Sequence, residues 1–239
     1  MASALMHGLG VAFGIAFGMP GFALACTGSG GGREPAPPPA RAPGPPGAAS
    51  AQVATARDSI GRDLVPPGYG TLRQDDIAVT IPLQGVIVKA IPLEESLIRL
   101  LSPDSYRALR DLLESRRDRI AELAARRALR DPSLWYVTYI GLEPNARFSP
   151  MEFRITSAAR DYRPVEIIPL NTGFGEQRLD QRETQSAIYL FENGVDTRHP
   201  LVITVQTEQS AAWGDKLRRI ERERASVRSR AAQSATPPA

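Results

Sequence analysis

The sequence predicts a mainly β protein with helical additions: an antiparallel β-sandwich, one long inserted helix and a C-terminal helix. Beyond residue 76, short segments repeatedly alternate apolar with polar side chains or consist of β-branched and aromatic residues. The period changes to that of a helix over about 94–130 and again over about 211–231. We therefore expect a single globular domain over 57–233, which is within the usual size of a domain.

Seven segments are expected to form the strands. They are short, mostly sequential, and separated by residues that favour turns. They cover residues 77–81, 86–91, 134–142, 151–157, 164–170, 186–192 and 201–207. Such a series is typical of a sandwich of the immunoglobulin or transthyretin type, or of a barrel. The chain has only one cysteine, so it lacks the cysteine pair of antibody domains.

The helix expected over about 94–130 lies between the second and third strands. Ser102, Pro103 and Asp104 form a helix-start signal, and Asp131-Pro132 ends the helix. Apolar residues gather near one face: Tyr106, Leu109, Leu113, Ile120, Leu123 and Ala124. Glu122 and Arg126 have the spacing of an ion pair along the helix. We expect the helix to pack on its own domain, with a coiled-coil partner as the alternative.

The C-terminal helix carries a narrow apolar seam with four-three spacing. The seam residues are Trp213, Leu217, Ile220, Arg224, Val227 and Ala231. We expect the helix to dock on the domain through Trp213 and Leu217 and to fray beyond them. Binding of a partner helix or of an anionic surface is the alternative. Residues 234–239 are expected to form a disordered tail.

The N-terminal segment 1–25 has the composition of a targeting signal. Met1–Cys26 contains no Lys, Arg, Asp or Glu, and Leu9–Ala25 is apolar and interrupted by Pro20. Three outcomes fit such a segment: a cleaved secretory signal, an uncleaved membrane anchor, or a lipoprotein signal. Residues 26–56 are rich in Gly and Pro, which is typical of a flexible tether.

The residues Ala23-Leu24-Ala25-Cys26 resemble the lipobox of bacterial lipoproteins, with the only cysteine of the chain at the required position. Ala23 stands where a lipobox usually has leucine, so the other two outcomes stay open. The resemblance implies that Cys26 is diacylated, becomes the first mature residue, and carries palmitate or a similar acyl chain as an N-linked lipid. It also implies a cell-envelope location. Because Thr27 replaces the aspartate that often retains lipoproteins at the inner membrane, the outer membrane is favoured, on its periplasmic or surface face.

Composition and charge exclude several classes of function. Lys and Arg number 29 against 26 Asp and Glu, and the two signs are interleaved, which is not the pattern of a nucleic-acid-binding protein. One cysteine rules out an internal disulfide and a cysteine-based zinc site. The chain also shows no His pair and no Asp-rich calcium loop. We expect no nucleic-acid partner, no metal, and no cofactor other than the covalent lipid on Cys26.

The polar loop Asn171–Gln185 lies between two apolar strands and is the best candidate for a binding surface. Its candidate contact residues are Phe174, Arg178, Asp180, Arg182 and Glu183. The sequence therefore predicts a non-enzymatic binding or assembly component of the envelope. Its partners would be the lipid bilayer, through the anchor, and other envelope proteins. The alternative is a secreted or envelope hydrolase with a site assembled from distant residues that include His199, which is expected on an exposed loop.

Overall fold

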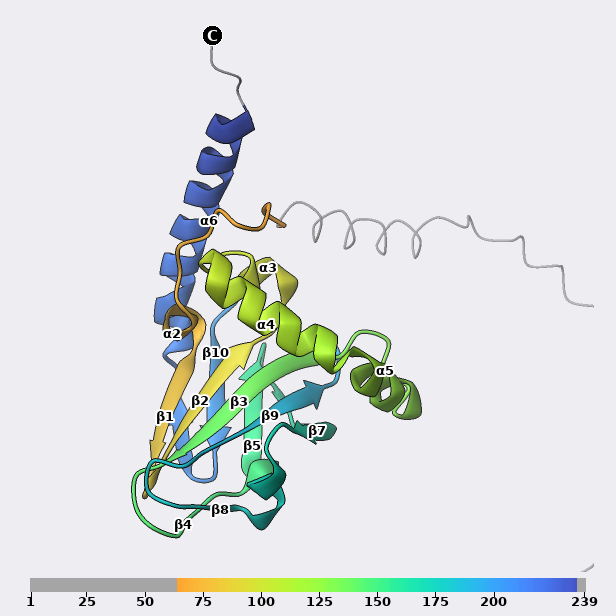
Figure 1. Ribbon diagram of the computed structural model, residues 1–239, viewed down its shortest axis with the longest axis vertical. Coiled ribbons are helices and arrows are strands. Elements are labelled where there is room, and N and C mark those ends of the chain that lie inside the picture. The colour runs from red at the N-terminus through yellow and green to blue at the C-terminus, as the bar shows by residue number, and fades with distance from the viewer. Residues whose placement is uncertain (1–63, 236–239) are drawn as a thin grey trace, which may run out of the picture. The chain divides into compact units, whose positions relative to one another are not determined.

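A computed structural model describes residues 64–235 of the chain. The signal-like segment 1–25, Cys26 and the tether 26–56 lie outside the described residues, so the structure does not test the expectations made for them. The described part is mainly β, with antiparallel sheets and a C-terminal helix (Figure 1). This confirms the coarse fold prediction.

Two larger sheets and one short ribbon make up the β structure. The five-stranded sheet has the order β1 (Val79–Leu83), β2 (Val86–Pro92), β3 (Ser133–Gly141), β9 (Thr184–Phe191) and β7 (Glu166–Pro169). The four-stranded sheet has the order β11 (Glu208–Ser210), β10 (Leu201–Val205), β5 (Phe153–Ser157) and β6 (Arg160–Tyr162). The ribbon pairs β4 (Ala146–Arg147) with β8 (Arg178–Leu179). All these strand pairs are antiparallel.

The core lies where the two larger sheets meet. Side chains along β1 are alternately buried and exposed, so one face of the strand packs in the core. Phe153 of β5 contacts Tyr189 of β9, with ring centroids 5.2 Å apart, so the sheets share this core. Each of the seven expected segments overlaps a strand, with boundaries that differ by up to two residues in several cases. The four short strands β4, β6, β8 and β11 were missed, because two or three residues are too few to show a period.

The inserted helix expected over 94–130 is three separate helices. They are α3 (Glu95–Ile98), α4 (Pro103–Ser115) and α5 (Arg117–Arg126). Between α3 and α4, Leu101 forms a parallel bridge with Leu72, and Pro103 has no N–H to continue the first helix. At Arg116, φ of −113° and ψ of 3° end α4. The prediction of one continuous helix was therefore wrong, because an interaction with a distant segment interrupts it.

Side-chain pairing along these helices also differs from the expected one. Arg126 contacts Glu166 of β7 at 3.3 Å, and Arg127 contacts the same carboxylate at 2.8 Å. Glu122 pairs with Arg119 at 2.7 Å instead of with Arg126. Arg126 of α5 and Arg127, the residue after it, thus connect this helix to β7 at the edge of the five-stranded sheet.

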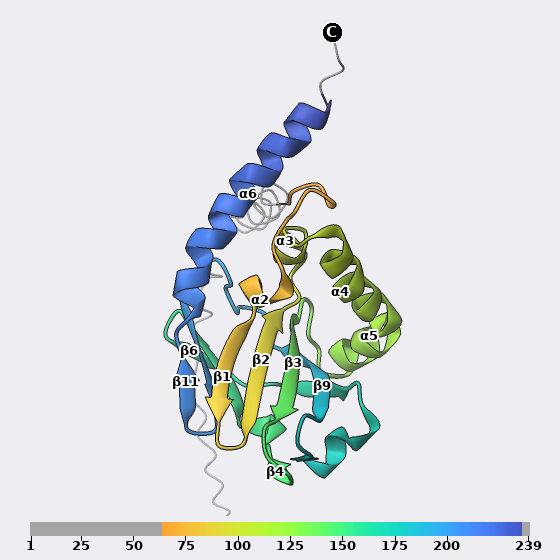
Figure 2. The ribbon, with the colours of Figure 1, turned by 60° about the vertical axis from the view of Figure 1, so that its left-hand side comes forward.

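Buried side chains lie along the C-terminal helix α6 (Trp213–Ala235) as far as Val227, and the end of the helix extends beyond the sheets (Figure 2). Trp213 is fully buried, and its Nε1 donates to the carbonyl of Thr197 at 2.9 Å. Ile220 and Val227 are also buried, so the expected fraying beyond Leu217 was wrong. The reason is the segment before β1, which includes α2 (Gln74–Ile77) and supplies a surface that the sequence periodicity did not reveal.

Candidate functional site

The loop between β7 and β9 is fixed to the end of β3 by close backbone contacts. Arg182 donates its N–H to the carbonyl of Gly141 at 2.8 Å, and Gly141 donates to the carbonyl of Glu183 at 2.9 Å. A Cβ on Gly141 would lie 2.2 Å from the carbonyl oxygen of Asp180, so only glycine permits this approach. The β4–β8 ribbon and the 3-10 helix η2 (Thr172–Glu176) complete this end of the molecule.

An aromatic cluster supports the loop from below. Phe174 of η2 is 4% exposed and contacts Phe148, with ring centroids 5.4 Å apart. Phe148 in turn stacks on Tyr139 of β3 at 4.4 Å. Phe174, expected among the contact residues, therefore points into the core and holds η2 in place. Buried aromatic contacts of this kind give the polar loop a rigid base.

Above this base the loop borders a solvent-open hollow of about 680 Å³. That volume falls within the range of small-ligand sites in proteins. Ten residues line it: Leu170, Asn171, Thr172, Gly173, Glu176, Arg178, Asp180, Glu183, Thr184 and Gln185. They come from η2, β8, the start of β9 and the connections between these elements. All but Leu170 and Gly173 have polar side chains, so the hollow suits a polar ligand.

The lining carries three carboxylates and one guanidinium. Glu176 and Asp180 are exposed, and no other described side chain bonds to their carboxylates. Glu183 accepts hydrogen bonds from the backbone N–H of Asp180 at 2.8 Å and from Nε2 of Gln185 at 2.6 Å. These bonds hold the pKa of Glu183 below its usual value, against a smaller opposing effect of desolvation. Arg178 Nη1 lies 3.5 Å from Oδ1 of Asn145. At neutral pH the three carboxylates therefore exceed the cationic charge.

Gln185 is the most unusual residue of the lining. It is 4% exposed, and its Oε1 has no hydrogen-bond partner among the described residues. A Cβ on Gly173 would lie only 2.6 Å from Nε2 of Gln185, so η2 passes directly over this amide. A buried acceptor without a donor costs about 1–3 kcal/mol. Such a group calls for an explanation, and an absent ligand donor is one.

The structure brings together three of the five predicted contact residues. Arg178, Asp180 and Glu183 line the hollow, whereas Arg182 is exposed outside this lining, in a left-handed conformation with φ of 66°. The sequence analysis did not single out Glu176 or Gln185. Gln185 could have been found, because it is a polar residue at an inward position next to the apolar run of β9.

His199 lies elsewhere, on the connection between β9 and β10. Its Nδ1 is 2.8 Å from Oδ2 of Asp196, and 71% of its side chain is exposed. Partial burial acts to raise the pKa of Asp196, but hydrogen bonds from Arg198 and His199 outweigh it and leave the pKa lowered. The hydroxyl of Ser157 bonds to the backbone of Asp196, with no bond recorded to His199. Asp196 and His199 are therefore in contact here, whereas the Ser157 hydroxyl forms its hydrogen bonds with the backbone.

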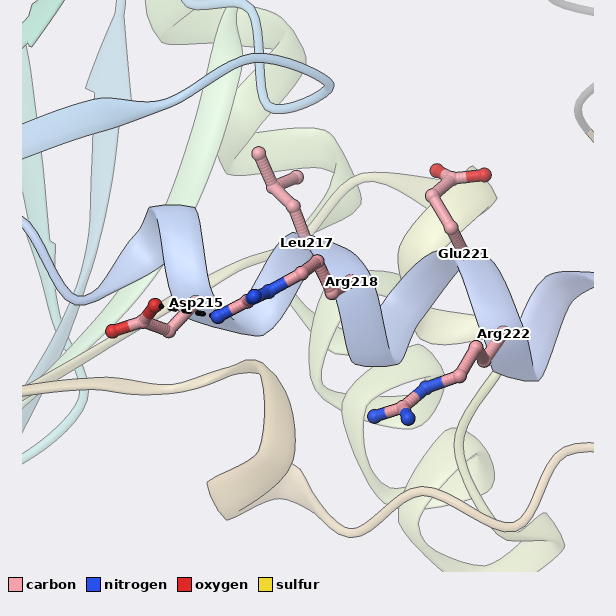
Figure 3. Close-up of a pocket in the computed structure, with 5 residues that line it drawn as sticks. All are labelled: Asp215, Leu217, Arg218, Glu221 and Arg222. Carbon is pink, nitrogen blue, oxygen red and sulfur yellow. Dashed lines mark hydrogen bonds and ion pairs between the residues drawn. The ribbon is translucent and has the colours of Figure 1, made fainter.

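A second concave surface of about 630 Å³ follows the first turns of α6 (Figure 3). The lining residues within the described part of the chain belong to this helix: Asp215, Leu217, Arg218, Glu221 and Arg222. Arg218 and Asp215 pair with each other at 3.2 Å, as the dashed line in Figure 3 shows. This surface has both signs of charge, and within residues 64–235 no second element contributes to its lining.

Across residues 64–235, no cluster of three or more acidic, His or Cys side chains has a geometry that could hold a metal ion. Within the same range, no helix is both long and apolar enough to cross a membrane. Comparison with known proteins finds no matching family model, no similar curated protein and no similar solved structure.

Proposed function

We propose that this chain is a cell-envelope lipoprotein whose β domain binds a partner and catalyses no reaction. The observation that carries the binding role is the hollow formed by the loop Asn171–Gln185 on a rigid aromatic base. Support for the anchor comes from the lipobox-like residues before Cys26 and from the Gly- and Pro-rich tether that follows. In this proposal diacylated Cys26 attaches the domain to the outer membrane, and the tether lets the hollow reach other envelope proteins.

The finer fold belongs to the same proposal. We infer a sandwich of the immunoglobulin or transthyretin type, with the two larger sheets as its layers. The contact between Phe153 and Tyr189 across these sheets supports it. In sandwiches the connecting loops gather at the two ends of the strands and are common binding surfaces. The β4–β8 ribbon, from which Arg178 lines the hollow, lies at one such end, away from α3 and α4 (Figures 1 and 2).

Two measurements test the anchor. The native protein is fractionated with membranes, and its intact mass is compared with that of a Cys26→Ala variant. We expect the wild type to carry acyl mass on a chain that begins at Cys26, and the variant to lose both the acyl mass and the membrane association. A wild-type chain that is cleaved without acylation, or not cleaved, would contradict the lipoprotein proposal.

Site-specific crosslinking in intact cells tests the binding role. A photoreactive amino acid is placed at Thr172, which lines the hollow, or at Asp111, an exposed residue of α4. We expect the Thr172 position to give a discrete crosslinked product and the Asp111 position to give none. Equal crosslinking from both positions, or none from Thr172, would count against the loop as the binding surface.

A hydrolase that uses His199 is the second candidate function. The contact of His199 with Asp196 at 2.8 Å favours it, since such a carboxylate can orient a histidine base. The test is hydrolysis of a panel of chromogenic esters by the wild type and by a His199→Ala variant. Turnover that the substitution abolishes would support this candidate, and the same rate in both proteins would dismiss it.

A further inference from the structure

We infer that the hollow formed by the loop Asn171–Gln185 binds a primary ammonium group. This inference rests on the proposed binding function and adds the chemical class of the ligand. Two features carry it: the excess of carboxylates in the lining, two of which have no ion-pair partner among the described residues, and the unfilled acceptor of Gln185.

The charge of the lining favours a cation. Within the described part of the chain, Arg178 is the one cationic residue of the lining, against Glu176, Asp180 and Glu183. Elsewhere in the described chain, many carboxylates are paired within the domain, as Glu166 is with Arg126 and Arg127. Glu176 and Asp180 instead face the hollow with no ion-pair partner. A ligand cation would fill that place, and charge-assisted hydrogen bonds to carboxylates are among the stronger polar contacts in proteins.

The acceptor of Gln185 favours a ligand that also donates hydrogen bonds. Its Oε1 lacks a donor, while its Nε2 is already engaged by Glu183. That second bond fixes the amide orientation, because the nitrogen must face the carboxylate. The oxygen therefore stays an acceptor, and only a donor group can satisfy it.

A primary ammonium group combines these requirements. It carries a positive charge and three N–H donors on a compact centre, and it has no acceptor of its own. Its three donors match in kind the buried acceptor of Gln185 and the carboxylates that line the same hollow. Bare metal ions fit less well, because no three acidic side chains of residues 64–235 converge as metal ligands. In an envelope partner the ammonium could belong to a lysine side chain or to an amino sugar.

Calorimetric titration of the full chain in a non-ionic detergent tests the inference and separates the two sources. The probes are trilysine amide and a glucosamine trimer, each beside its fully N-acetylated counterpart. We expect at least one free amine to bind, with acetylation weakening it by roughly 10-fold or more, the value of one charge-assisted hydrogen bond. Binding should also weaken as salt is raised. The amine that binds more tightly identifies the source.

Variants assign the binding to the hollow. Asp180→Asn and Glu176→Gln remove one charge each while keeping the side-chain size, and Gln185→Met removes the acceptor. We expect each to weaken the amine by roughly 3- to 10-fold. Asp111→Asn, an exposed change on α4 at the other end of the sheet, should leave it unchanged. Circular dichroism of each variant checks that the fold is retained.

Three results would overturn the inference: no binding by either free amine, equal binding of the acetylated probes, or equal weakening by Asp111→Asn. The Thr172 crosslink remains a separate test of the proposed function. A discrete crosslink together with a failed amine titration would retain the binding role and reject only the ammonium ligand. A missing crosslink would reject the binding role itself.

Discussion

The α6 side and the loop end of the domain use their charged residues in opposite ways. Along α6, Glu223 accepts from the backbone and hydroxyl of Thr71 and from Arg230, and Arg219 contacts Asp76 at 2.9 Å. At the loop end, Glu176 and Asp180 have no bond to another described side chain. The charged residues of the α6 side form contacts within the domain and hold α6 against the segment before β1. The carboxylates at the loop end leave their charges available, as a binding surface requires.

The largest effect is expected at the α6 side from Trp213→Ala. Trp213 is fully buried, contacts Trp135 with ring centroids 6.3 Å apart, and bonds to the carbonyl of Thr197. Its removal should lower the free energy of unfolding by about 3–5 kcal/mol, measured by urea denaturation. Leu217→Ala, a partly buried neighbour on the same helix, should cost clearly less. Equal losses from both changes would mean that α6 does not dock through Trp213.

A strong effect at the loop end is expected from Gly141→Ala. The added Cβ would meet the carbonyl of Asp180 at 2.2 Å, so the loop must shift, at a cost of about 1–3 kcal/mol. Crosslinking from Thr172 should fall in the same variant. Gly175→Ala is the matched control, because nothing lies within 4 Å of its Cβ position. A loop that tolerated both changes would not depend on its attachment to β3.

Removal of one carboxylate sharpens the comparison between the two regions. Glu223→Gln should lower the free energy of unfolding by about 1–2 kcal/mol, because the charge-assisted bonds of Arg230 and Thr71 weaken. Asp180→Asn should change it by less than about 0.5 kcal/mol, as is usual for an exposed residue without partners. Thermal and urea unfolding of both variants measure the difference. A larger loss in Asp180→Asn would mean that the loop-end charges are structural.

The smallest effect concerns the dependence of stability on pH. Because the folded-state pKa of Glu183 is lowered, its contribution is present above the unfolded value, which is about 4.3, and is lost as pH falls through the folded value. Glu183→Gln should therefore reduce the loss of stability between about pH 5 and pH 3. Urea denaturation across this range checks it, with Glu176→Gln as the unpartnered control. An unchanged slope in Glu183→Gln would show that its hydrogen bonds do not persist in solution.

Much of the strand content followed from local patterns. The alternation in β5 and the β-branched and aromatic run of β3 both indicated strands that the structure contains. Pro103 marked the beginning of α4, although Ser102 makes no side-chain capping bond there. These strand and helix predictions succeeded for one reason: period and turn chemistry act over a few residues. Three of the five loop residues named from the sequence also line the hollow, and their role as a contact surface stays a prediction.

The misses come from contacts between distant parts of the chain. Thr71 and Glu223 are 152 residues apart, and Arg230 donates to the carbonyl of Tyr69 across 161 residues. No local pattern indicates such a partner, so the sequence analysis did not predict the docked length of α6 or its packing against the segment before β1. Phe174 was mistaken for a contact residue because burial of one aromatic ring in a polar loop depends on Phe148 and Tyr139, which are distant in sequence.

The sequence by itself determined the lipobox-like position of Cys26, the periods of the strands and helices, and a polar loop between two apolar strands. Only the tertiary structure decided that this loop borders a hollow, that three carboxylates line it, and that Oε1 of Gln185 lacks a donor among the described residues. The physical reason is that backbone periodicity is a local property. Whether a buried polar atom finds a partner depends instead on every element that packs around it.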